Sequence, residues 1–201
     1  MNMERIRELA WTDYLLCAVT DPRELYRRIK QAGKDILPWS FAIPALCAFF
    51  DIIIISLSGR QTLFFYYRIS YGWLLVFLLL LVKTLVYSSL IDTSSQFFGH
   101  KGNVRETVTL VNLSLFPRLF FLPLYYVITI AGFMPGFFYV FLGFVFFCWF
   151  IFILVQGLSE MNSITSGRAL AIIVMPAVLA AVVFFFIVVV LAITLMGYIA
   201  S

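Results

Sequence analysis

Charged residues are scarce in this sequence. Only 12% of its 201 residues are charged and 63% are hydrophobic, whereas a soluble domain is about a quarter charged and about half apolar. Phe, Trp and Tyr alone make up 18% of the chain. A water-soluble protein of this length could not enclose so much aromatic surface in its core, but lipid can solvate such a surface. The composition therefore excludes an ordinary soluble domain and indicates an integral membrane protein.

The side chains that most enzymes and metal sites use are also few. The chain has one histidine and three cysteines, and the cysteines lack the spacing of a metal site. It contains no G-x-S-x-G, no H-E-x-x-H, no phosphate loop and no G-x-G-x-x-G. One catalytic alternative stays open, a serine–lysine arrangement of Lys83 with a serine such as Ser88. We expect no enzyme activity, no cofactor and no metal site.

Long hydrophobic runs dominate what is present. A hydrocarbon core of about 30 Å needs roughly 20 helical residues, and five segments are long enough. The predicted spans are about 36–58, 71–91, 108–130, 137–157 and 168–198. The fold class is therefore an all-α, polytopic membrane bundle, with an N-terminal segment over residues 1–35 and a membrane domain over 36–201. The last span is longer than a bilayer requires, so we expect it to start in the interface, tilt or bend at Pro176.

The distribution of positive charge predicts the orientation. Half of the fourteen Lys and Arg residues precede residue 35, and the loops 92–107 and 158–168 carry further basic residues. The positive-inside rule places these segments in the cytoplasm, with the C-terminus external or periplasmic. The net charge of +4 could suggest nucleic acid, but its position next to a span fits an anionic lipid surface better. We expect no nucleic-acid partner.

The segment Thr20 to Gly33, TDPRELYRRIKQAG, has the pattern of a short amphipathic helix. Asp21 can cap it, Pro22 suits its first turn, Glu24 is at the capping-box position and Gly33 suits its end. Its apolar stripe is Leu25, Tyr26 and Ile29. We predict an interfacial helix on the cytoplasmic leaflet, with a solvated basic lead-in as the alternative.

Basic residues of this helix and of the loop 92–107 form the predicted inner-leaflet surface, which would bind anionic lipid headgroups. Its members are Arg23, Arg27, Arg28, Lys30, Lys101 and Arg105. In the loop, Gly99 and Gly102 permit a tight turn, and Asn103 can cap the following helix with Glu106 at the capping-box position.

Three ionisable residues fall at membrane depth, namely Asp51, Lys83 and Arg118. Such residues are costly in lipid and usually face a bundle interior or a cavity. Helical spacing places Tyr87 beside Lys83, and Ser114 beside Arg118, while Pro117 frees a backbone acceptor. The predicted intramembrane polar core comprises Asp51, Lys83, Tyr87, Ser114, Pro117 and Arg118, with Asp51 as the first candidate partner of Arg118. It would carry protons, bind a lipid headgroup or switch conformation; alternatively, it is an ion pair or triad that fixes helix register.

Three stretches, DPRELYRRI, FGHKGNVRETVTLVNLSLFPRL and QGLSEMNSITSGRALAIIVMP, together resemble the Yip family, the Ypt/Rab-interacting-protein membrane domain. The positions that carry the resemblance are Gly99, Gly102, Pro117, Gly157 and Arg168. It implies five spans with a cytoplasmic N-terminus. The chain lacks the long cytosolic N-terminal region and the D-L-x-G-P motif of eukaryotic members, so Rab binding is not implied. It looks like a bacterial or archaeal branch member in a prokaryotic plasma (inner) membrane.

Two functions are consistent with these patterns. The first is a non-enzymatic scaffold or accessory subunit that organises lipids or a larger membrane complex such as an ABC-type exporter. Its partners would be lipids and other membrane proteins or a second copy, and the small-residue pair Ala177 and Ala181 suits helix contacts. The alternative is a small-solute or proton-coupled transporter that uses Asp51, Lys83 and Arg118.

Overall fold

The computed structural model describes residues 11–57, 69–132 and 134–199. Within these residues every regular element is a helix, and five helical stretches are long and apolar enough to cross a membrane. They are Ile36–Ile55, Gly72–Phe97, Val104–Ile130, Pro135–Asn162 and Ser166–Leu191. The predicted all-α, five-span bundle is therefore confirmed. Residues 1–10 of the N-terminal segment and residue 58 of the first predicted span lie outside the described residues.

The N-terminal segment forms two short helices, α2 (Trp11–Thr20) and α3 (Pro22–Ala32). The Asp21 carboxylate accepts hydrogen bonds from the backbone N–H groups of Arg23 and Glu24, at 3.2 Å each, and Gly33 ends α3 with a φ of 65°. A positive φ of this kind favours glycine. The helix boundaries predicted from these residues are confirmed.

The first span is built from α4 (Ile36–Ser40) and α5 (Ala42–Leu57), preceded by the 3-10 turn η1 (Gly33–Asp35). The helix is interrupted by a turn at Phe41. Pro44 has no N–H to donate to the Ser40 carbonyl, which accounts for a break at this point. The second span is one long helix, α6 (Ile69–Phe97).

The third span is broken in the middle. It consists of α7 (Val104–Ser114), the 3-10 helix η2 (Phe116–Phe120) and α8 (Phe121–Ile130). Pro117 lies in η2, and the Arg118 N–H donates to the Leu115 carbonyl at 2.9 Å, three residues back. This is the tighter hydrogen-bond spacing of a 3-10 helix. At the start of α7, Asn103 is the N-cap as predicted, because its Oδ1 accepts from the Glu106 N–H at 3.5 Å. The two side chains also meet, with Asn103 Nδ2 donating to Glu106 Oε1 at 2.6 Å.

Two long helices complete the fold, α9 (Pro135–Asn162) and α10 (Ser166–Ile199). The loops before α7 and α10 are shorter than predicted, because α6 continues to Phe97 and α9 to Asn162. Residues that the sequence placed in the loops 92–107 and 158–168 thus belong largely to helices. The prediction ended these two helices too early, because polar residues can lie in the last turns of a long helix as well as in a loop.

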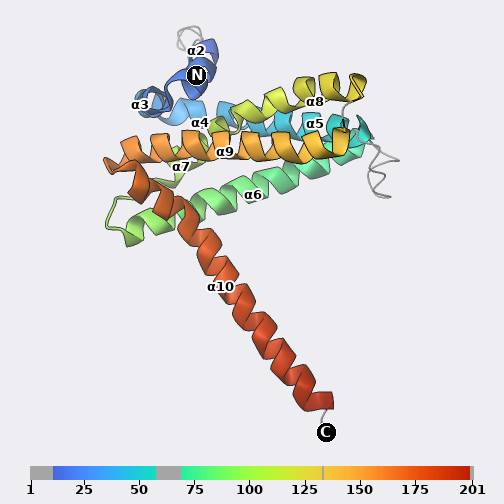
Figure 1. Ribbon diagram of the computed structural model, residues 1–201. Coiled ribbons are helices and arrows are strands. Elements are labelled where there is room, and N and C mark those ends of the chain that lie inside the picture. Colours follow the sequence, from blue (N-terminus) through green and yellow to red (C-terminus); the bar gives the residue numbers. More distant parts are fainter. Residues whose placement is uncertain (1–10, 58–68, 133, 200–201) are drawn as a thin grey trace.

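The helices α5, α6, α8 and α9 lie alongside one another, while α2 and α3 cover one end of the bundle (Figure 1). The turns before α7 and α10 lie at this same end (Figure 1). The core of the bundle is a cluster of buried apolar side chains that includes Leu25, Ile29, Leu110, Leu154 and Leu158. The first turns of α10 pack on α9 and α6, with Ala169 and Ile172 fully buried. The C-terminal part of α10 projects away from the bundle (Figure 1).

Candidate functional site

An ion pair joins the first and third spans. Arg118 Nη2 lies 2.8 Å from Asp51 Oδ2, and Arg118 Nε donates to Asp51 Oδ1 at 3.3 Å. Two parallel N–H···O bonds of this kind fix both distance and orientation. The pair is not enclosed, because the side chain of Arg118 is 44% exposed and that of Asp51 is 21% exposed. The structure therefore brings together the two residues that the sequence paired.

The break in the third span positions Arg118. Pro117 cannot donate to the Leu113 carbonyl, and the chain tightens into η2 at this point. Arg118 is fourteen residues from Val104 and twelve from Ile130, the ends of its span, so it lies about 21 Å from one end and about 18 Å from the other. Asp51 is six residues, or about 9 Å, before Leu57, the last described residue of α5. The long arginine side chain reaches toward that end to meet the carboxylate.

Lys83 approaches the same region from α6 and brings a second positive charge. It is eleven residues after Gly72 and fourteen before Phe97, which places it about 17 Å and 21 Å from the ends of its span. Its ammonium group makes no ion pair with the carboxylates of the described residues. With one carboxylate for two cations, this part of the membrane domain carries one excess positive charge.

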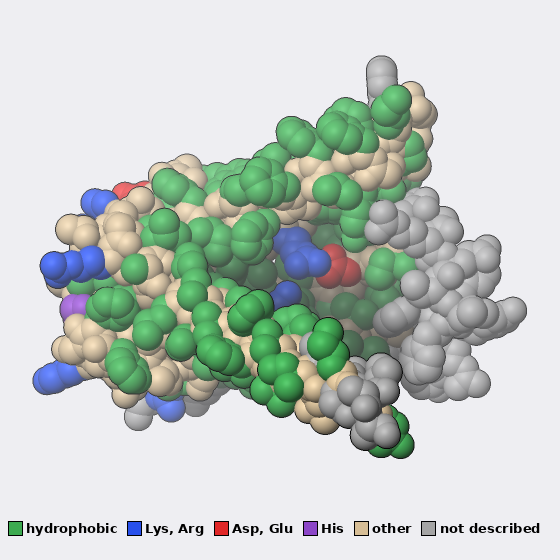
Figure 2. Space-filling model, turned by 60° about the horizontal axis from the view of Figure 1, so that its bottom comes forward, with side chains coloured by type: hydrophobic (Ala, Val, Ile, Leu, Met, Phe, Trp, Pro, Cys, Tyr) green, Lys and Arg blue, Asp and Glu red, His purple; other side chains and the backbone are tan. Residues whose placement is uncertain are grey.

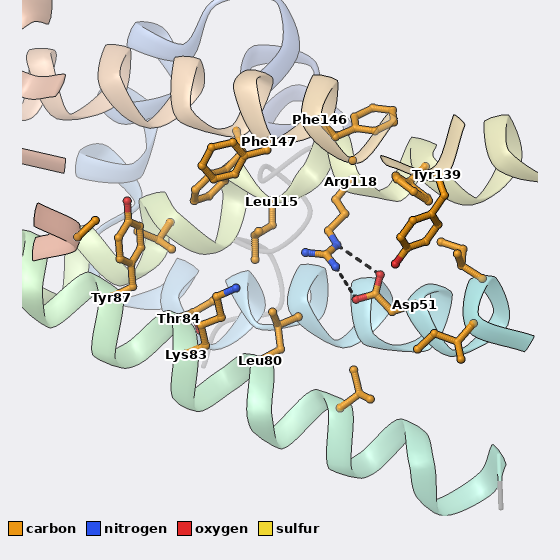
Figure 3. A pocket seen from close by; sticks show the side chains of 18 residues that line it. Asp51, Leu80, Lys83, Thr84, Tyr87, Leu115, Arg118, Tyr139, Phe146 and Phe147 are labelled. Atoms are coloured by element: carbon orange, nitrogen blue, oxygen red, sulfur yellow. Dashed lines mark hydrogen bonds and ion pairs between the residues drawn. The ribbon is translucent and has the colours of Figure 1, made fainter. Parts of the chain in front are cut away.

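These three side chains line a cavity of about 620 Å³ between α5, α6, η2 and α9. Figure 2 shows basic and acidic side chains in a hollow of a face that is otherwise largely hydrophobic. In the close view, Lys83 and Arg118 project into the cavity from opposite walls, and Asp51 lies on the far side of the guanidinium from Lys83 (Figure 3). The remaining walls are mostly Ile, Leu, Val and Phe.

The other predicted polar residues divide between the cavity and the helix interior. Tyr87 lines the cavity with Lys83, as predicted (Figure 3). Ser114 does not line it, because its side chain is fully buried and donates to the Leu110 carbonyl of its own helix at 2.7 Å. Pro117 is buried within η2 and acts through the backbone. The spacing argument placed Ser114 and Arg118 on one helix face, but Ser114 ends α7 and Arg118 lies in η2, so the change of winding separates them.

Two residues of α9 in the cavity wall were missed by sequence reasoning. Tyr139 points toward the ion pair (Figure 3), and Gly143 leaves room beside Phe121, 3.9 Å from where its β-carbon would be. A phenylalanine-rich span has apolar residues all round, so helical periodicity cannot distinguish its lipid face from its inner face. The only available signals were the Tyr139 hydroxyl and Gly143, which lie one turn apart on the same helix face.

A second polar group lies where α6 meets α7 and was also missed. Asp92 is 2% exposed, its Oδ2 accepts from Gln96 Nε2 at 2.9 Å, and its Oδ1 has no hydrogen-bond partner among the described residues. Gly102 covers it, since a β-carbon there would lie 2.5 Å from Asp92 Oδ2. Close approach to this carboxylate is thus the structural reason for glycine at position 102. Gly99 serves the turn itself, with a φ of 81°.

The predicted amphipathic helix α3 packs on protein. Leu25, Tyr26 and Ile29 are buried against α7 and α9, so the apolar stripe that we assigned to the lipid interface contacts the bundle instead. Tyr26 Oη donates to Glu106 Oε2 at 2.8 Å. Burial, followed by this bond to the carboxylate, raises the pKa of Tyr26.

Three of the basic residues assigned to the inner-leaflet surface bind acidic or amide groups. Arg27 Nε lies 2.9 Å from Glu160 Oε1, and Arg23 Nε donates to Gln156 Oε1 at 2.9 Å, while Arg28 pairs with Asp13 and Glu24. Lys30, Lys101 and Arg105 are exposed. Lipid contact remains a prediction for all six residues. Arg23 and Arg27 also hold α3 on α9 through their bonds to Gln156 and Glu160.

The remaining motif positions have distinct environments. Gly157 is buried in α9 against Leu110 of α7, and Arg168 is exposed in the first turn of α10. Over residues 11–57, 69–132 and 134–199, no group of three His, Cys, Asp or Glu residues could hold a metal ion. The cavity itself presents charged groups, hydroxyl groups and an apolar wall.

The fold and this site define a polytopic α-helical membrane protein with charged residues in a cavity between its spans. A family described as Yip1 domain matches residues 16–189. The chain belongs to this family, as the three sequence stretches indicated. Neither the curated proteins nor the solved structures that were searched contain a match to it.

Proposed function

We propose that this Yip family protein is a non-enzymatic scaffold that organises membrane lipids by holding a lipid between its spans. The cavity beside Asp51, Lys83 and Arg118 carries this proposal. Its volume of about 620 Å³ falls in the range of pockets that hold small molecules. A lipid has a polar headgroup and apolar chains. The cavity suits both, because a few charged groups converge among walls that are mostly apolar.

Occlusion of the cavity tests the proposal. Gly143 lines the cavity, so Gly143→Phe should place a ring inside it. Gly136 lies in the same helix with nothing within 4 Å of its β-carbon position, and Gly136→Phe is the matched control. The proteins would be extracted in native lipid and their retained lipids quantified by mass spectrometry. The proposal expects lipid retained by the unaltered protein and by Gly136→Phe but lost from Gly143→Phe; no retained lipid in any of the three would refute it.

The C-terminal part of α10 supports the proposed accessory role in a larger complex. From Val178 onward most of the large apolar side chains that the structure describes are exposed, whereas Ala169, Ile172 and Ile173 in its first turns are buried. A second copy or another membrane protein, such as a subunit of an ABC-type exporter, could pack there through the small residues Ala177 and Ala181. Ala181→Phe should then shift the mass of the assembly in native membrane nanodiscs toward the monomer, and an unchanged mass would count against this role.

A transporter is the second candidate, because the Asp51–Arg118 pair and Lys83 face one cavity. A carboxylate that releases its arginine on protonation could couple movement of a solute to that of a proton. In proteoliposomes, Asp51→Asn should abolish flux while leaving the protein folded. Flux equal to that of protein-free vesicles for the unaltered chain would exclude this candidate.

We further propose that the protein lies in a prokaryotic inner membrane with α3 in the cytoplasm. The support is the excess of basic residues at the end of the bundle that holds α3 and the turns before α7 and α10. A membrane-impermeant thiol reagent added to intact cells should fail to label a cysteine at Ser163, in the turn before α10, and should label it after the cells are opened. Labelling in intact cells would reverse the orientation.

A further inference from the structure

The charged residues of the cavity indicate which class of lipid it binds. We infer that the cavity binds the headgroup of an anionic lipid, with Lys83 and Arg118 as the groups that contact its phosphate. This inference rests on the proposed lipid-binding function and names the class of lipid. Its basis is the geometry of three charges, which leaves two cationic groups facing one space with no anion between them (Figure 3).

The ion pair leaves Arg118 with unused donors. A guanidinium has five N–H groups, and Asp51 accepts from Nε and Nη2 only. The Asp51 carboxylate occupies the side of the guanidinium away from Lys83, so the opposite edge faces the cavity and Lys83 (Figure 3). Guanidinium edges and ammonium groups are both strong phosphate donors. Asp51 orients Arg118 for this contact and also lowers the net charge of the site to one.

The depth of Lys83 supports an anionic occupant over a zwitterionic one. A lysine near the middle of a span is costly unless it has a partner or water, and Lys83 forms no ion pair with the described carboxylates. An anionic headgroup would neutralise the one excess charge. A zwitterionic headgroup would bring its own cation into a site that already has two, and like charges repel.

The walls indicate a lipid and not a free inorganic anion. The cavity volume of about 620 Å³ falls in the range of pockets that hold drug-sized molecules, which is far more than one phosphate needs. Beyond the charged groups it is lined by Ile54, Leu80, Leu115, Phe121, Phe146 and Phe147, among others. Apolar walls of this extent gain nothing from an inorganic ion but bury the acyl chain of a lipid.

The test compares anionic and zwitterionic lipid on the full chain. The protein would be placed in nanodiscs of phosphatidylcholine and phosphatidylglycerol in equal amounts, and the lipids that remain bound after transfer to detergent would be quantified by native mass spectrometry. The variants are Lys83→Gln, Lys83→Arg and, as a control for loss of one exposed positive charge elsewhere, Arg168→Gln.

The unaltered protein, Lys83→Arg and Arg168→Gln should all retain phosphatidylglycerol in preference to phosphatidylcholine. Lys83→Gln should reduce that preference by about tenfold, because a hydrogen bond to a charged group contributes enough to change a binding constant by this factor. Equal retention of the two lipids by the unaltered protein would overturn the inference, as would an unchanged preference in Lys83→Gln. Competition by inorganic phosphate as effective as by a short-chain phosphatidic acid would also overturn it, in favour of a free anion.

These outcomes are separable from failure of the scaffold proposal. If Gly143→Phe expels lipid but Lys83→Gln does not change its class, the cavity holds lipid without selecting its charge. In that case the headgroup inference fails and the proposed function stands. If neither the unaltered protein nor any variant retains lipid, the headgroup inference and the proposed function both fail.

Discussion

Gly157 of α9 and Leu110 of α7 touch so closely that no side chain fits between them. A β-carbon at position 157 would lie 2.5 Å from Leu110 Cδ1 and 2.9 Å from Cδ2. Leu110 is fully buried, so its side chain would have to shift within the core to make room. The glycine that contributed to the family resemblance therefore sets the distance between the third and fourth spans at the end of the bundle that α3 covers.

Gly157→Ala should destabilise the protein through this contact. Forcing a methyl group into a packed core costs about 1–3 kcal/mol, and thermal unfolding in detergent would show the loss as a lower midpoint. Gly136→Ala is the control, because no atom lies within 4 Å of its β-carbon position. Leu110→Ala should partly rescue Gly157→Ala, since it removes the colliding methyl groups. Equal midpoints for the two glycine variants would contradict the packing argument.

The Asp51–Arg118 pair should show coupling between its members. Asp51→Asn leaves a cation without its partner and Arg118→Gln leaves an anion, so each single change should cost about 1–2 kcal/mol, the upper part of the range for polar contacts between membrane helices. The double variant should cost less than the sum of the two, because neither charge remains. A denaturation series in one detergent measures all four proteins. Strict additivity would mean that the pair contributes no interaction energy.

Much of the fold followed from the sequence because its signals are local. The five spans are apolar runs of the required length, and the starts of α3 and α7 are specified by Asp21 and Asn103 and their neighbours. The position of α3 was different. Its stripe of Leu25, Tyr26 and Ile29 fits a lipid surface as well as a protein groove, and only the placement of α7 and α9 decides between them.

The charged residues of the site were predictable because ionisable side chains at membrane depth are energetically unfavourable. Asp51, Lys83 and Arg118 stand out on that ground alone, and the first and third of them do meet. The cavity around them was not predictable, because its existence depends on how far apart α6 and α9 are held. Asp92 was hidden for a related reason, since an aspartate near the end of an apolar run is normally the start of a loop.

Gly102→Ala should disturb the turn between α6 and α7 more than its exposed position suggests. The added carbon would collide with the side chains of Gln96 and Asp92. Asp92 is 2% exposed, so its carboxylate would have to shift within the buried contact between α6 and α7. We expect a loss of about 1–3 kcal/mol. Gly167→Ala is the matched control, because its β-carbon position is open. Hydrogen exchange of the amides at the start of α7 should rise in Gly102→Ala only; unchanged exchange would show that the turn yields freely.

Charge reversal should separate lipid contact from helix docking at the basic end of the bundle. Lys101→Glu should weaken binding of the full chain to anionic vesicles, by about 1 kcal/mol for each lost basic contact, and leave α3 in place. Arg27→Glu should expose α3 to protease, because it breaks the pair with Glu160. The double variant Arg27→Glu with Glu160→Arg should restore the ion pair with its charges exchanged and protect α3 from the protease again. Release of α3 by Lys101→Glu, or no release by Arg27→Glu, would contradict this division.

Alkaline pH should release α3 through Tyr26. Burial and the bond to Glu106 raise the pKa of this phenol above its ordinary value of 10.0, so the folded state keeps the proton that the unfolded state loses. The stabilisation is fully present below pH 10.0 and declines as the pH rises further toward the folded-state pKa. Cleavage within α3 by an alkaline protease should therefore increase above that pH.

Tyr26→Phe distinguishes this titration from a general loss of structure at high pH. The variant loses one hydrogen bond, which costs about 1 kcal/mol, and should be cleaved somewhat faster at neutral pH. It has no proton to release at position 26, so its cleavage should rise less steeply above pH 10.0. The difference between the tyrosinate absorbance curves of the two proteins reports the titration of Tyr26 directly. A midpoint in that difference curve at or below 10.0 would show that burial against α7 does not hold the proton on the phenol.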